Sequence, residues 1–243
     1  MPHQLWFTEI LNRLFAGPVT ALLIALGVHP HHAAAPISNT FAMEFLIVLV
    51  LGVYFLFVRA SLSVEKPGPI QHVAEFFDGF IKNQSNELIG HGYEPFTSFL
   101  VTLGMFILFG NLLGLIPGFE APTADPSVPL GCAIVVFVYY HMHGIRKHGF
   151  HYIKQFIGPV WWLAPLMLVI ELCSHFARVM SLTVRLFANM FAGDMVTLGF
   201  FSLIPLGVPI VFLVLHIGVS LIQTFIFVLL ATVYLSGAME EAH

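Results

Sequence analysis

Long apolar runs separated by short polar segments dominate the chain. The first clear run is Phe41–Val58, whose 18 residues include one charge, Glu44. In a helix that rises about 1.5 Å per residue, such a run nearly crosses a hydrocarbon core of about 30 Å. Two further apolar runs extend over about Thr97–Ile116 and Val128–Met142. The pattern predicts three membrane-spanning helices before the last third of the chain.

Residues 70–89, between the first two runs, have a different pattern. Apolar side chains recur there at helical spacing, at Ile70, Val73, Phe76, Phe77, Phe80 and Ile81. Charged side chains occupy the opposite face, at Glu75, Asp78 and Lys82. A helix with one apolar and one charged face is typical of the membrane surface, so we expect an interfacial helix here.

The last third of the chain contains two stretches that are too long for upright spans. The first covers about 40 residues between Pro165 and Pro205, roughly 60 Å as a helix. The second, Gly207–Met239, has about 33 residues and would be roughly 50 Å long. Both are apolar almost throughout, so we expect two steeply tilted antiparallel helices joined by a short turn near Leu206. The total is about five transmembrane segments plus interfacial helices.

The N-terminal segment differs from a secretory signal peptide. Glu9 and Arg13 cancel the positive charge that a signal needs at its start, and Gly17-Pro18 interrupts the apolar part. We expect an interfacial or re-entrant helix instead. The predicted organisation is an extracytoplasmic or interfacial segment at 1–40 and a single polytopic membrane domain at 41–243.

Composition and charge agree with an all-α integral membrane protein. The chain is 58% hydrophobic and 9% charged, whereas soluble domains carry about 25% charged residues. One basic residue, Arg13, precedes the first span. The basic residues in the loops after the first and third spans are Arg59, Lys66, Lys82, Arg146, Lys147 and Lys154. This bias predicts an N-terminus outside the cell and a cytoplasmic C-terminus.

Arg185, in the first of the two long stretches, requires an explanation. A guanidinium keeps its proton in proteins, so burial does not neutralise it. Holding this charge at membrane depth is costly, and charged residues placed there usually serve an ion pathway. The neighbouring polar residues therefore bear on the function.

Counting outward from residue 206 gives the relative depth of these polar residues. Asp194 is 12 residues before it and His216 is 10 after it, so the two are at similar depth. Asn189 and Gln223, each 17 residues away, are level with one another. Arg185 lies deeper, near the middle of a ladder of polar groups.

Helical phase separates the ladder into two groups. Glu171, Arg178 and Arg185 recur every seven residues and share one stripe. Asp194, nine residues beyond Arg185, faces another side, where we expect it to form an outer aqueous pocket with His216.

A second pocket, nearer the cytoplasm, is predicted around Glu171 and His175. On the last helix one polar stripe is formed by His216, Ser220, Gln223 and Thr224. Two water-filled pockets separated by Arg185 would not form a continuous pore.

Structural roles are the alternative for each of these residues. Asp194 and Glu171 could only neutralise the arginines, Arg178 could extend to the interface, and His216 could be a packing residue. Interhelical hydrogen bonding is the alternative for Asn189, Gln223 and Asn111.

Two motifs in this chain resemble those of a known family. The run Arg185–Asp194, with His216, Gln223 and the ending Val233–Ser236, closely resembles subunit a of the F-type ATP synthase membrane sector. The run Phe109–Gly118 is similar to the second-span motif of that family. The resemblance covers about residues 40–240.

The chain departs from the family pattern at two positions. Ala188 stands where many relatives have glycine, and Asp194 stands where many have the longer glutamate. The shorter carboxylate bears directly on the distance between residue 194 and His216.

The resemblance implies a proton-driven stator in a bacterial inner membrane, where Arg185 faces the carboxylates of a rotating ring. The implied proton pathway comprises Asp194, His216, Gln223, Asn189, Glu171, His175 and Ser220, with Arg178 and Asn111 as weaker candidates. The implied partners are the c-subunit ring, the peripheral-stalk b subunits, other ATP synthase subunits and the lipid bilayer.

The chain is not expected to be an enzyme on its own. It contains no P-loop, Gly-rich nucleotide fingerprint or G-x-S-x-G motif, so we expect no direct nucleotide binding. No cofactor, metal or nucleic acid is expected either. A self-contained proton-coupled secondary transporter is the alternative function, although the chain lacks the two comparable halves that many transporters show.

Overall fold

The computed structural model describes residues 5–25, 35–63, 67–90, 92–116, 118–149, 164–203 and 207–239. Regular structure in these ranges is entirely helical, which confirms the predicted all-α architecture. The elements are α1 (Trp6–Ala25), α2 (Asn39–Ala60), α3 (Pro69–Ile89), α4 (Glu94–Leu113), the 3-10 turn η1 (Pro122–Ala124), α5 (Ser127–His148), α7 (Ala164–Leu203) and α8 (Val208–Met239).

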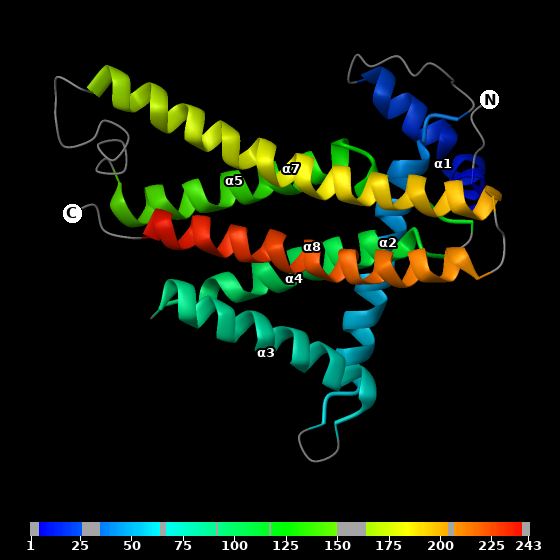
Figure 1. Cartoon of the computed structure of the whole chain (residues 1–243), viewed down its shortest axis with the longest axis horizontal. Coiled ribbons are helices and arrows are strands. Elements are labelled where there is room, and N and C mark those ends of the chain that lie inside the picture. Colours follow the sequence, from blue (N-terminus) through cyan, green and yellow to red (C-terminus); the bar gives the residue numbers. More distant parts are fainter. Residues whose placement is uncertain are drawn as a thin grey trace.

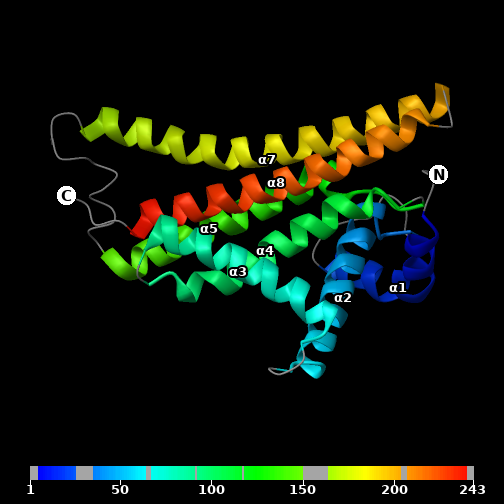
Figure 2. The same cartoon turned by 60° about the horizontal axis from the view of Figure 1, so that its bottom comes forward.

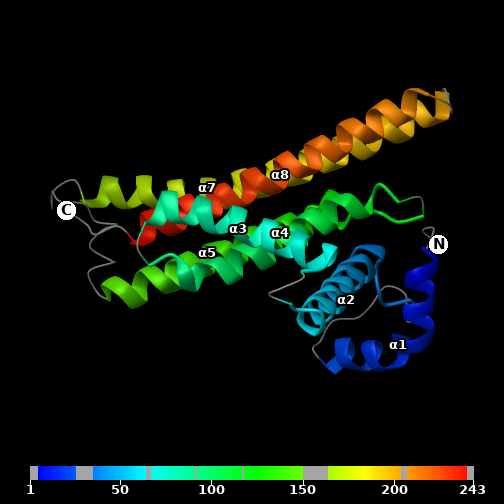
Figure 3. The same cartoon turned by 90° about the horizontal axis from the view of Figure 1, so that it is seen from below.

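The helices are arranged in layers. Helices α7 and α8 lie antiparallel and side by side along the long axis of the molecule (Figure 1). Helices α4 and α5 form a second layer against them, and α3 packs beside α4 and α8 (Figures 2 and 3). Helix α2 crosses this second layer steeply, and α1 packs against α2.

The steep crossing of α2 constrains how the molecule fits a bilayer. Helix α2 has 22 residues, about 33 Å, close to the hydrocarbon thickness. Helix α7 has 40 residues, about 60 Å. The two directions differ, so α2 and the α7–α8 pair cannot both stand along the bilayer normal. Because α2 matches the hydrocarbon thickness and α7 is about twice as long, α7 and its partner α8 are the helices that tilt strongly.

Six described helices are long and apolar enough to cross a membrane. Five of them, α2, α4, α5, α7 and α8, correspond to the predicted spans. The sixth is α1, which Asn12 ties to the start of α2 through hydrogen bonds with the Ile37 carbonyl (3.2 Å) and N–H (3.0 Å). Its length also suits a span, so an interfacial position for residues 1–40 stays a prediction, as does the division from residues 41–243.

Two helix ends differ from the sequence prediction. Helix α4 ends at Leu113 rather than near Ile116, because the following turn brings Ala121 against Gly114. A Cβ on Gly114 would lie 2.7 Å from the Ala121 Cβ. Helix α5 continues to His148, past the predicted end at Met142.

The extension of α5 corrects the predicted third loop. Arg146 and Lys147, expected in that loop, belong to the last turn of α5. There Lys147 Nζ donates a hydrogen bond to the Met239 carbonyl at 2.6 Å, which ties α5 to the end of α8. Lys66, Lys154 and the turn at Leu206 lie outside the described residues.

The α7–α8 pair keeps one antiparallel register along its length. The rings of Phe200 and Phe212 stack with centroids 4.3 Å apart. Further along, Ser220 Oγ is 3.9 Å from the Met190 sulfur. Nearer the opposite end, the Arg178 guanidinium lies 5.1 Å from the centre of the Tyr234 ring. This register confirms that residues equally distant from the turn face each other.

A shared apolar core joins this pair to the second layer. Its fully buried members come from four helices and include Leu100 and Ile107 of α4, Val136 and Tyr140 of α5, Leu186 and Met190 of α7, and Ala231 and Leu235 of α8. The core fixes the polar faces of α7 and α8 relative to α4 and α5.

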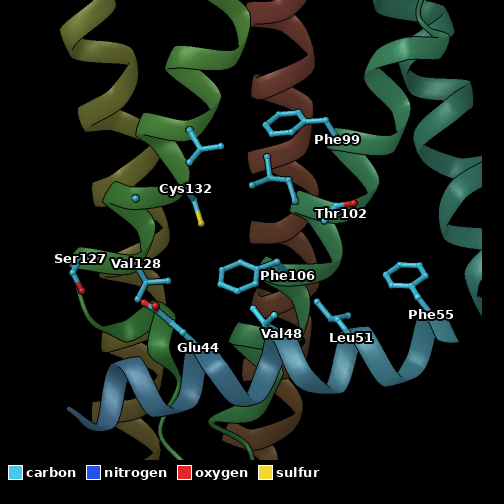
Figure 4. Close-up of a pocket in the computed structure, with 14 residues that line it drawn as sticks. Glu44, Val48, Leu51, Phe55, Phe99, Thr102, Phe106, Ser127, Val128 and Cys132 are labelled. Atoms are coloured by element: carbon cyan, nitrogen blue, oxygen red, sulfur yellow. The ribbon is translucent and has the colours of Figure 1, made fainter. Parts of the chain in front are cut away.

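A cavity of about 680 Å³ lies where α2 crosses α4 and α5 (Figure 4). Its walls are mostly apolar, with the Glu44 carboxylate beside Ser127 and Val128. None of the described residues that line it belongs to α7 or α8. The cavity is therefore separate from the polar ladder of the last two helices.

Candidate functional site

Asp194 and His216 meet between α7 and α8, as the depth count predicted. Asp194 Oδ1 lies 3.7 Å from His216 Nδ1, and the His216 side chain is 3% exposed. The imidazole fits because residue 193 is glycine. A Cβ on Gly193 would lie 3.0 Å from His216 Nδ1.

A cavity of about 540 Å³ opens beside this pair. Its polar lining includes Thr40 of α2, Thr197 of α7, Glu120 and Asp125, none of which the sequence reasoning proposed. No site residue was predicted in the segment around residues 120–126, but η1 packs against α7, and Glu120 and Asp125 on either side of η1 line the cavity beside Asp194. The concentration of acidic residues in that short segment was the available signal.

Asp125 is held at the start of α5 by several hydrogen bonds. It accepts from Ser127 N at 2.9 Å, Ser127 Oγ at 2.5 Å and Thr40 Oγ1 at 3.1 Å. Partial burial raises the pKa of this carboxyl, but the hydrogen bonds outweigh burial and place the pKa below its ordinary value. Asp125 is therefore a fixed negative charge on the wall of the cavity, and it links α2 to α5.

Polar side chains continue from this cavity into the interface of α4 with α8. Asn111 Nδ2 donates to the Ser220 carbonyl and to Thr224 Oγ1, each at 3.3 Å. Asn111 and Ser220 are fully buried, and Gln223 is nearly so. Asn111 therefore forms the interhelical hydrogen bonds that were the structural alternative for it.

Some buried polar atoms near this interface have no hydrogen-bond partner among the described residues. They are Asn111 Oδ1, Thr123 Oγ1 and His216 Nε2. Buried polar groups are nearly always paired with protein or with ordered water. This unused hydrogen-bonding capacity lies around the α4–η1–α8 junction, where a polar site of this kind is one that buried water typically fills.

Glu171 and His175 also come together, near the first turns of α7. His175 Nε2 lies 3.3 Å from Glu171 Oε1, and the Glu171 side chain is 37% exposed. The other ring nitrogen, Nδ1, is 2.8 Å from the hydroxyl of Tyr140 on α5. The His141 ring packs 4.7 Å away, centroid to centroid. Tyr140 and His141 were not among the predicted site residues.

Arg185 lies on α7 between these two groups. Its Nη2 donates to Ser181 Oγ, one turn earlier, at 3.2 Å, and the residue remains partly exposed. No carboxylate in the part of the chain that the structure describes forms an ion pair with it. Asn189, one turn further along, is also partly exposed. The guanidinium is accessible to a group from outside the chain.

Arg178 differs from Arg185 in its surroundings. Its guanidinium lies over the Tyr234 ring, a geometry that cation–π attraction stabilises. This contact gives Arg178 a structural partner within the chain, whereas the hydrogen-bond partner of Arg185 among the described residues is the neutral hydroxyl of Ser181.

Comparison with known proteins covers the whole chain. A family model described as ATP synthase A chain matches residues 40–236. Similar proteins include ATP synthase subunit a of Koribacter versatilis, 62% identical over 244 residues that cover all of both chains. Subunit a of Solibacter usitatus is 46% identical over 96% of this chain and all of the relative. Subunit a of Geobacter sulfurreducens is 38% identical, again over all of both chains.

Proposed function

The chain belongs to the ATP synthase A chain family, and we propose that it is the proton-translocating stator subunit of an F-type ATP synthase. It forms two aqueous half-channels that load and unload the carboxyl groups of a rotating c-ring. Proton flow through them is coupled to ATP synthesis elsewhere in the complex. The chain itself neither binds nor hydrolyses ATP.

The observation that carries this proposal is the position of Arg185. A permanent cation on an apolar helix, partly exposed and without a carboxylate partner in the described chain, suits a mobile partner on another subunit. An ionised carboxyl is strongly disfavoured in lipid, whereas its protonated form is tolerated there. Opposite Arg185 the ionised form is favoured, so a passing ring carboxyl gives up its proton.

The outer half-channel is assigned to the cavity beside Asp194 and His216. The carboxylates of Glu120 and Asp125 on its wall attract protons, and their negative charge raises the local cation concentration. From His216 the polar residues Ser220, Gln223 and Asn189 continue towards the depth of Arg185. Thr123 and Asn111 line the same passage on the side of α4 and η1.

The inner half-channel is assigned to Glu171 and His175, with Arg178 nearby. Arg185 lies between the two groups along α7, where its charge opposes direct passage of a proton from one half-channel to the other. Each proton that crosses contributes about 2.3 kcal/mol per 100 mV of membrane potential. Coupling requires that this free energy be released only through ring rotation.

The proposal includes a location and an orientation. The chain lies in a bacterial inner membrane with its N-terminus outside and its C-terminus in the cytoplasm. The start of α7 then faces the cytoplasm, and the Asp194 cavity faces outward. The c-ring contacts the Arg185 face of α7, and peripheral-stalk b subunits hold the chain against rotation.

Copurification tests the assignment against a self-contained transporter. A tagged chain isolated in mild detergent should bring down a ring of two-helix subunits. The same chain isolated alone and placed in vesicles should catalyse no substrate-coupled proton exchange. Such exchange by the isolated chain, with no ring copurifying from the membrane, would contradict the stator assignment.

A further inference from the structure

Three side chains in close polar contact, one hydrogen bond and one His–carboxylate pair, connect α5 to the exposed part of α7. Tyr140 is fully buried on α5, and its hydroxyl is 2.8 Å from His175 Nδ1. His175 Nε2 in turn lies 3.3 Å from Glu171 Oε1. Both nitrogens of one buried imidazole thus have a partner, one inside the protein and one at its surface.

The partners select one tautomer of the neutral ring. An ionised carboxylate only accepts hydrogen bonds, so Nε2 must carry the proton that faces Glu171. Nδ1 then has only a lone pair, and the Tyr140 hydroxyl donates to it. A hydrogen bond to the ring nitrogen that faces away from Glu171 fixes both the tautomer and the orientation of the ring.

Other charged and titratable groups surround the ring. His141 of α5 is 4.7 Å away between ring centroids, and its own Nδ1 is 2.9 Å from the Phe137 carbonyl. Tyr234 of α8 is 6.2 Å from the Tyr140 ring and packs against Arg178. These groups bound the site on α5, α7 and α8.

We infer that Tyr140 is a positioning residue for the inner proton pathway, because it holds the His175 Nε2–H on the Glu171 carboxylate. The inference rests on the proposed function. An arriving proton is taken by a Glu171 carboxylate oxygen, which gives the neutral acid. The acid then releases that proton to water on the cytoplasmic side. His175 keeps its own proton throughout and stabilises the ionised form of Glu171 between transfers.

The test is proton pumping by the whole complex in vesicles, measured against the pH on the cytoplasmic side. Tyr140→Phe removes one hydroxyl and frees the imidazole to leave Glu171. The ionised carboxylate loses a fixed polar neighbour, so the pH profile of pumping should shift relative to the parent. Tyr139→Phe is the matched control, since Tyr139 stacks on Phe99 at 3.8 Å between centroids. It should leave the profile unchanged.

A double substitution separates the positioning of His175 from a general effect on folding. In a His175→Gln background, Tyr140→Phe should add no further shift, because the hydroxyl acts through the imidazole. An additive shift, or a Tyr140→Phe profile that coincides with the parent, would overturn the inference. If the Tyr140→Phe complex fails to assemble, the tautomer of His175 is measured in the unaltered complex from the ¹⁵N chemical shifts of its ring. They should report the Nε2–H tautomer, and an Nδ1–H tautomer contradicts the inference.

Failure of this inference is distinguishable from failure of the proposed function. Loss of coupled pumping in Arg185→Ala, together with an unshifted Tyr140→Phe profile, would remove only the role of Tyr140. Retained pumping in Arg185→Ala would remove the stator assignment itself.

Discussion

Asp194 on α7 and His216 on α8 face each other with Oδ1 and Nδ1 3.7 Å apart. That separation exceeds a direct N–H···O hydrogen bond of about 2.7–3.2 Å. It is short enough for electrostatic attraction and for a small shift to close the gap. The pair lies between the cavity lined by Glu120 and Asp125 and the buried polar face of α8.

Substitutions at residue 194 should separate the effect of side-chain length from the effect of charge on proton conduction. Asp194→Glu adds one methylene and extends the carboxylate towards His216, so proton conduction should be retained or increased. Asp194→Asn keeps the size and removes the charge, so conduction should fall about tenfold or more. Passive proton flux through the membrane sector, with the catalytic sector removed, measures both. Equal flux in all three proteins would contradict a role for the carboxylate.

Gly193 should be required for the position of His216. In Gly193→Ala the new Cβ would lie 3.0 Å from Nδ1 and 3.1 Å from Cε1 of the imidazole. The ring must shift within a closely packed site, so proton conduction should fall several-fold. Gly199→Ala on the same helix is the control, since no atom lies within 4 Å of its Cβ position. A similar loss in both variants would point to a helix effect instead.

Asn111 should contribute to stability through its bonds to α8. Asn111→Ala removes both interhelical hydrogen bonds and should lower the free energy of unfolding by about 1–3 kcal/mol. Asn189→Ala, on the partly exposed face of α7, should have a smaller effect. Thermal unfolding of the detergent-purified complex compares them. An unchanged midpoint for Asn111→Ala would show that these bonds are dispensable.

Much of the α7–α8 arrangement could be predicted from the sequence. The apolar run between Pro165 and Pro205 predicted a helix that the structure places at Ala164–Leu203. Counting from the turn predicted the Asp194–His216 contact, because two antiparallel helices of equal rise keep their register. The predicted grouping of Glu171 with His175 needs only their four-residue spacing, which places them one helical turn apart on α7.

Contacts across the layers could not be predicted in this way. Tyr140 reaches His175 only because α5 packs against α7, and no periodicity within one helix fixes that packing. Glu120 and Asp125 reach the cavity because η1 folds back onto α7. The short α4 likewise depends on Ala121 packing on Gly114. These features are set by long-range contacts rather than by local pattern.

The hydrogen bonds of Asp125 predict a pH-dependent contribution to stability. In the folded protein the pKa of Asp125 lies below its ordinary value of 3.8. The ionised carboxylate therefore stabilises the fold at every pH above 3.8. The contribution is lost as the pH falls through the folded pKa. Thr40→Val should therefore lower the unfolding midpoint at pH 7, and the difference should vanish in strong acid.

Thr102→Val provides the comparison for this experiment. The Thr102 hydroxyl donates to the Ser98 carbonyl of its own helix at 2.8 Å, so its acceptor is a backbone carbonyl rather than a carboxylate. Its substitution should produce a shift that does not vary with pH. A pH-independent effect of Thr40→Val would contradict the stabilisation of an ionised Asp125.

Arg185→Ala in the assembled complex tests the central claim most directly. The matched control is Arg59→Ala, which removes an exposed arginine from the last turn of α2. Both complexes should assemble and hydrolyse ATP, and ATP-driven acidification of inverted vesicles is then measured. Pumping should be abolished by Arg185→Ala and retained in Arg59→Ala. Coupled pumping by an assembled Arg185→Ala complex would contradict the account.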